Sequence, residues 1–145
     1  MVSASDIKNV QDTWTKLYDQ WEAVHASKFY NKLFKDNEDI SEAFVKAGTG
    51  SGIAMKRQAL VFGAILQEFV ENLSDPTALS LKIKGLCATH KTRGITNMEL
   101  FAFALADLVA YMGTTISFTA AQKTSWTAVN DVILHQMSSY FATVA

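Results

Sequence analysis

Hydrophobic residues along the chain recur three and four positions apart, with polar residues between them. This spacing is typical of helices that turn one apolar face toward a core, and no stretch shows the alternation of a half-buried strand. Ser3 followed by Asp6 predicts a capping arrangement that opens the first helix. The inward stripe of that helix comprises Ile7, Val10, Trp14 and Leu17. The pattern predicts an all-α fold.

Residues that begin or end helices divide the rest of the chain. Proline occurs once and glycine seven times, so few positions interrupt a helix. Asp75 before Pro76 predicts an N-cap with proline at the first helical position. T-x-x-E at 96–99 and T-A-A-Q at 119–122 predict two capping boxes. We expect about seven helices with short connections, those after the first spanning roughly residues 21–34, 36–44, 51–73, 76–94, 96–112 and 119 to the C-terminus.

Composition narrows the class of protein. A chain of 145 residues that is 49% hydrophobic and 19% charged suits one globular domain, residues 1–145, rather than a disordered segment. The net charge is −1 and the basic residues are scattered, which argues against nucleic acid or an anionic membrane surface as a partner. Apolar runs such as ALVFGAIL are too short to span a bilayer. A polar N-terminus and a single cysteine, Cys87, favour a cytoplasmic protein.

Three polar residues fall on apolar faces of three different helices. His90 ends the stripe of Leu79, Ile83 and Leu86, Gln58 begins that of Phe62, Ile65, Phe69 and Leu73, and Tyr30 lies among the inward positions of the second helix. Each has an ordinary explanation, since a core histidine or tyrosine usually finds a hydrogen bond and a glutamine can lie at a solvent edge. An unsatisfied buried polar group costs roughly 1–3 kcal/mol, however, so three together favour a shared pocket.

These features together resemble the globin family over essentially the whole chain. They are Trp14 in the first helix, Phe44 after a short third helix, H-K-x-R-G-I at 90–95 and F-V-x-N-L-x-D at 69–75. Intracellular haemoglobins of molluscs and annelids are the most similar branch. Gln58 precedes His90 at nearly the spacing that globins use, but Phe44 lies unusually close before Gln58. We therefore expect the small fourth helix of the family to be absent, with the glycine-rich V-K-A-G-T-G-S-G in its place.

The resemblance implies a haem b pocket in which His90 is the one protein ligand of the iron. Its other ring nitrogen is then expected to donate to a backbone carbonyl or hydroxyl about one turn earlier. Phe44 would pack flat against the porphyrin, and Gln58 would take the distal position, where histidine is usual. Lys46 and Arg93 match partners of the haem propionates, although a solvated surface role is equally compatible. The remaining pocket residues would be Tyr30 opposite Gln58, Phe62 one turn beyond it, and Ile95 and Phe101 in the wall.

The function implied is reversible binding of dioxygen, and of other diatomic gases, for transport or storage. Bound dioxygen carries partial negative charge, so donors at Tyr30 and Gln58 could slow its release on the order of 10- to 1,000-fold. Glutamine does not titrate near neutrality, so we expect little pH dependence from the distal side. The alternatives are a haem enzyme, acting as a nitric oxide dioxygenase or weak peroxidase, and a haem-free helical interaction protein. Association with like chains or other globin chains is compatible with the sequence, but no feature demands it.

The other chemically reactive side chains carry no further function. His25 and His135 are expected at the surface or at the edge of the core, and neither has a partner at metal-ligand spacing. Cys87 is expected to be a small core residue.

Overall fold

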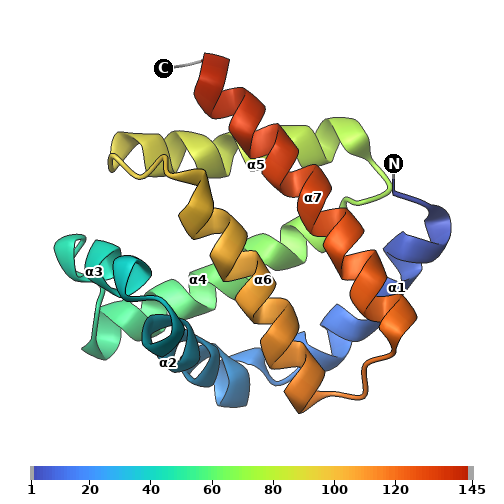
Figure 1. The fold of residues 1–145 in the computed structure, drawn as a ribbon, viewed down its shortest axis with the longest axis horizontal. Coiled ribbons are helices and arrows are strands. Elements are labelled where there is room, and N and C mark those ends of the chain that lie inside the picture. Colours follow the sequence, from blue (N-terminus) through green and yellow to red (C-terminus); the bar gives the residue numbers. More distant parts are fainter. Residues whose placement is uncertain (1, 144–145) are drawn as a thin grey trace.

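The computed structural model describes residues 2–143, which form seven α-helices and a π-helical turn and contain no strand (Figure 1). This confirms the all-α prediction. In chain order the elements are α1 (Ala4–Tyr18), η1 (Trp21–His25), α2 (Ala26–Asp36), α3 (Glu38–Lys46), α4 (Gly52–Glu71), α5 (Pro76–Thr92), α6 (Met98–Thr115) and α7 (Ala120–Thr143).

Three helices begin where local side chains satisfy their first backbone N–H groups, as the sequence predicts. Ser3 and Asp6 form a reciprocal capping box at α1. The Asp75 carboxylate accepts from the N–H of Ala78 at 3.1 Å, with proline at the first position of α5. Thr119 and Gln122 pair reciprocally at 2.9 and 3.1 Å before α7. Each cap satisfies backbone donors that have no partner within the helix.

Two local predictions were wrong. The T-x-x-E motif does not cap α6, because Asn97, the next residue after Thr96, accepts from the N–H of Glu99 at 3.0 Å and serves as the N-cap. The predicted single helix from Trp21 is instead a π turn followed by α2. Hydrogen bonds five residues apart widen that turn, which buries Trp21 and His25.

The segment between α3 and α4 contains no helix, which confirms that the small fourth helix of the family is absent. Gly48 and Gly52 adopt left-handed backbone angles, with φ of +76° and +64°, which other residues rarely adopt. Thr49 donates from its backbone N–H and its hydroxyl to the carbonyl of Phe44, at 2.8 and 3.2 Å. These two bonds tie the loop that follows α3 back onto the end of that helix.

The main core lies where α7 packs across α1, α5 and α6, and α1 also contacts α4 (Figure 1). Its centre is an aromatic cluster in which Trp14 lies 5.6 Å from Trp21 and 6.3 Å from Trp126, centroid to centroid. α6 is long and apolar enough to pass for a membrane span by length and composition alone. Its apolar residues have a use within the fold, because they pack on α7 and α2 and line a cavity.

Candidate functional site

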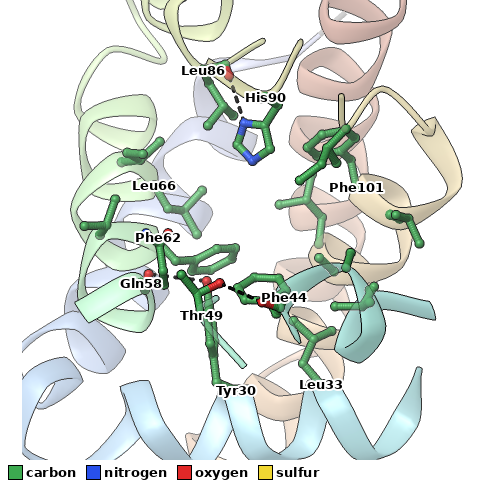
Figure 2. A pocket seen from close by; sticks show the side chains of 18 of the residues that line it. Tyr30, Leu33, Phe44, Thr49, Gln58, Phe62, Leu66, Leu86, His90 and Phe101 are labelled. Carbon is green, nitrogen blue, oxygen red and sulfur yellow. Dashed lines mark hydrogen bonds between the residues drawn. The ribbon is translucent and has the colours of Figure 1, made fainter. Parts of the chain in front are cut away.

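A cavity of about 170 Å³ lies between α4, α5 and α6, with α2 and α3 at its far end (Figure 2). Its lining is mostly aliphatic and aromatic. An apolar cavity of about 150 Å³ is already enough to bind a benzene-sized molecule, so this space suits a ligand. All seven residues expected at the site line it, namely Tyr30, Phe44, Gln58, Phe62, His90, Ile95 and Phe101.

His90 enters the cavity from the last turn of α5. Its Nδ1 lies 2.9 Å from the backbone carbonyl oxygen of Leu86, and because a carbonyl can only accept, Nδ1 carries the hydrogen. Nε2 therefore keeps its lone pair, and Figure 2 shows the ring pointing into the cavity. Burial lowers the pKa of His90, opposed by the bond to Leu86, and the charge of Arg93 lowers it further. The structure thus presents a neutral imidazole with one nitrogen free to bind a metal.

The end of α5 fixes where this imidazole lies. Gly94 has a φ of +74°, and the N–H of Ile95 donates back to the carbonyl of His90 at 2.9 Å. This left-handed ending reverses the chain one turn after the histidine and brings Ile95 into the cavity wall. From α6, the Phe101 ring packs edge-on against the imidazole, with centroids 5.1 Å apart and an angle of 73°.

Tyr30 and Gln58 lie on the opposite side of the cavity from His90 (Figure 2). The Tyr30 side chain is 3% exposed, and burial raises its pKa, so the phenol stays protonated as a donor. Its hydroxyl donates to the backbone carbonyl of Gln58 at 3.3 Å, longer than the usual 2.5–3.0 Å between hydroxyl donor and acceptor. Within residues 2–143 the Gln58 side-chain amide makes no hydrogen bond. Tyr30 and Gln58 thus each bring a hydrogen-bond donor to the cavity lining, and the Tyr30 donor already has the Gln58 carbonyl as its acceptor.

Aromatic rings pack around these donors. The Tyr30 ring lies edge-on to Phe44 at 5.4 Å and 88°, and 5.9 Å from Phe62. Phe34 supports Phe44 from behind at 4.9 Å. Thr49, which lines the cavity and donates to the carbonyl of Phe44, was not predicted, because a threonine inside a glycine-rich loop gives no sign of such a role.

Five further residues were singled out in the sequence, namely Cys87, His25, His135, Arg93 and Lys46. Cys87 is fully buried and burial raises its thiol pKa to about 11, which confirms a core residue. His25 is not at the surface: it is buried, and its Nδ1 lies 2.8 Å from the hydroxyl of Tyr111. His135 is exposed, as expected. Arg93 lines the cavity while exposed Lys46 does not, and no contact tests their proposed roles.

The donor set constrains what kind of metal site this can be. Within the described part of the chain, no three His, Cys, Asp or Glu residues cluster as a bare metal ion would require. His90 stands alone on its side of an apolar cavity, facing Tyr30 and Gln58. A metal held here needs its other ligands from a prosthetic group, which is how haem iron is bound in proteins.

An all-α fold with one histidine facing an apolar cavity is the architecture of globins, and the sequence comparisons agree. The Globin family model matches residues 27–137. Globin-1 of Phreagena soyoae is 94% identical over 144 residues, covering 99% of this chain and all of that protein. Globin-2 of the same organism is 43% identical over 94% of this chain and 95% of its own length. Globin CTT-II beta of Chironomus thummi thummi is 27% identical over 74% and 72%. The chain belongs to the globin family.

Proposed function

We propose that this globin holds haem b in the cavity through His90 and reversibly binds dioxygen for transport or storage. The observation that carries the proposal is the single neutral imidazole whose free Nε2 faces an apolar cavity, with Tyr30 and Gln58 on the opposite side. Family membership supports the same group, because the Globin family model covers residues 27–137, which include all seven residues expected at the site.

The lining residues fit a large planar apolar group. Phe44 and Phe101 present aromatic rings to the cavity, and Ile95 lines it near the end of α5. Arg93 lines the cavity and is also exposed, which suits an anionic substituent that reaches solvent. Haem, when bound, supplies the iron at which a diatomic gas is held; the chain holds and orients the group, keeps water out and offers donors to the gas.

The distal residues favour a gas carrier over an enzyme. The Tyr30 hydroxyl and the Gln58 amide are both able to donate a hydrogen bond to a bound gas, and such a bond stabilises dioxygen more than carbon monoxide because bound dioxygen is more polar. Neither exchanges protons near neutral pH: burial raises the pKa of Tyr30, and an amide does not titrate. Peroxidase chemistry needs a group that moves protons, and neither Tyr30 nor Gln58 supplies one near neutral pH. Enzyme activity, as a weak peroxidase or a nitric oxide dioxygenase, therefore ranks second to gas carriage.

Absorption spectra of the purified protein test the haem proposal directly. The wild type should show a haem spectrum that changes reversibly with dioxygen. His90→Ala should lose haem retention or its five-coordinate ferrous spectrum, and added imidazole should restore that spectrum by filling the vacated space. His135→Ala is the matched control because His135 is exposed and far along α7. A wild-type spectrum in His90→Ala would refute the assignment.

Turnover measurements separate the carrier from the enzyme. Dioxygen equilibrium and dissociation rates should show reversible binding, with slow turnover of hydrogen peroxide and nitric oxide in the presence of an electron donor. Fast turnover with either substrate would favour the enzyme. The absence of any haem spectrum would favour a haem-free interaction protein.

A further inference from the structure

A close contact between η1 and α4 lies directly behind the distal wall of the cavity. Trp21 is almost fully buried, and its Nε1 donates to the backbone carbonyl of Ala59 at 2.9 Å. A Cβ added at Gly63 would lie 2.5 Å from Cδ1 of Trp21 and closer still to Nε1. The indole therefore occupies space that only a glycine at position 63 leaves free.

The indole of Trp21 also stacks on Phe62, and the Phe62 side chain reaches the cavity. The two rings are 6.0 Å apart at an angle of 23°. Phe29, at 5.4 Å, and Tyr30, at 5.9 Å, hold the Phe62 ring on further sides. Phe62 lines the cavity whereas Trp21 and Gly63 do not. Phe62 is therefore the direct route from Trp21 to a ligand, and a longer route runs through Phe29, at 6.1 Å from Trp21, to Tyr30.

The π turn explains how Trp21, the first residue of η1, reaches α4. The N–H of Ala26 bonds to the carbonyl of Trp21, five residues back, which widens the turn and buries both Trp21 and His25. π turns frequently occur at functional sites, where the extra residue redirects side chains. Here the turn directs an indole onto Gly63, against the helix that carries Gln58 and Phe62.

We propose that Trp21 is a positioning residue that holds Phe62 at a fixed depth in the cavity and thereby limits the entry and size of gaseous ligands. The inference rests on the proposed gas-binding function. The indole, Phe29 and Tyr30 all pack against the Phe62 ring and restrict how far it can withdraw, so an incoming ligand meets it in place. A smaller ring at position 21 opens space behind Phe62 and lets it move back.

The test measures association rates of carbon monoxide and of n-butyl isocyanide, a bulkier ligand that also binds through carbon, after flash photolysis of the haem-loaded protein. Trp21→Phe should raise the carbon monoxide rate about 2- to 10-fold, the equivalent of one aromatic pair contact, and the isocyanide rate by more. Gly63→Ala should also raise both association rates, because the added Cβ displaces the indole from its place against Phe62. Trp21→Phe with Gly63→Ala should return toward wild type, because the added methyl fills the space that the smaller ring leaves.

A cycle with Phe62→Leu distinguishes positioning from general loosening. In the Phe62→Leu background, Trp21→Phe should change the rates little; an unchanged fold-effect there would overturn the inference. Trp126→Phe is the matched control, because it removes a buried indole that donates to Thr13 at 2.7 Å on another side of the core. It should lower the unfolding midpoint by a similar amount and leave the ligand rates alone. Equal rate effects in both tryptophan variants would also overturn the inference.

Hydrogen exchange of the indole N–H groups tests the contact independently of ligand binding. In Gly63→Ala the Trp21 indole should lose protection, while those of Trp14 and Trp126, bonded at 2.7 Å to Gln67 and Thr13, should keep it. Retained protection at Trp21 would show that the contact is not tight and would count against the proposal. A protein without a haem spectrum overturns the gas-binding function as well, whereas normal spectra with unchanged rates overturn this inference alone.

Discussion

Replacing Tyr30 with phenylalanine isolates the contribution of one hydroxyl to dioxygen binding. The substitution keeps the ring, so its packing against Phe34, Phe44 and Phe62, at centroid distances of 5.4–5.9 Å, should be retained. What is lost is one donor, whose present acceptor is the carbonyl of Gln58 at 3.3 Å. Because that bond is longer than usual, turning the hydroxyl toward a gas sacrifices little.

The expected size of the effect follows from the value of one neutral hydrogen bond. A net gain of about 0.5–1.5 kcal/mol corresponds to about a 2- to 12-fold change in dissociation. Tyr30→Phe should therefore speed dioxygen release within that range. Carbon monoxide release should change less, since bound carbon monoxide is less polar and gains less from a donor. Gln58→Leu should have an effect of the same order through loss of its amide.

Stopped-flow displacement of dioxygen by carbon monoxide measures these rates. The carbon monoxide dissociation rate, measured by displacement with nitric oxide, serves as the control for general disturbance of the pocket. Dioxygen release that stays within about twofold of wild type in both Tyr30→Phe and Gln58→Leu would show that neither donor reaches the gas. Equal acceleration of both gases would show that packing rather than hydrogen bonding had changed.

Two further predictions concern buried polar groups outside the cavity. Lys32→Met should lower the free energy of unfolding in urea by roughly 1–3 kcal/mol, because it removes the 2.7 Å partner of buried Asp107. Lys8→Met, which breaks an exposed pair, should cost at most about 1 kcal/mol, and equal losses would contradict this reasoning. Burial lowers the pKa of His25 below 6.5, so its contribution to stability is complete above pH 6.5 and falls as pH drops below it. His25→Gln should reduce that slope in urea titrations of the haem-free protein, leaving the part due to His90; an unchanged slope would refute the role of His25.

The parts of the fold that depend on neighbouring residues in the sequence could be predicted from it. The caps at Ser3, Asp75 and Thr119 satisfy N–H groups within three residues, so the local sequence was sufficient. At α6 the prediction placed the cap at Thr96, whereas the next residue, Asn97, makes the bond. The π turn could not be foreseen, because its register follows from burying Trp21 against a helix far along the chain.

The candidate site divides in the same way. His90, Gln58 and Tyr30 were found because each breaks an apolar stripe in its own helix, and the fold brings all three to one cavity. Contacts between residues distant in the sequence were missed, because no periodicity reveals them. Trp21 bonds to a residue 38 positions away, and His25 to one 86 positions away.

The backbone carbonyl of Gln58 couples the two donors of the distal side, the Tyr30 hydroxyl and the Gln58 amide. Its carbonyl accepts the Tyr30 hydroxyl, so the residue that offers an amide to the gas also competes with the gas for the phenol proton. Gln58→Leu removes the amide but leaves this carbonyl in place. In that variant the hydroxyl is the remaining donor, and it must still leave the carbonyl to reach the gas. The effects of Tyr30→Phe and Gln58→Leu should therefore not be additive, and the coupling between them measures how far the tyrosine turns toward the ligand.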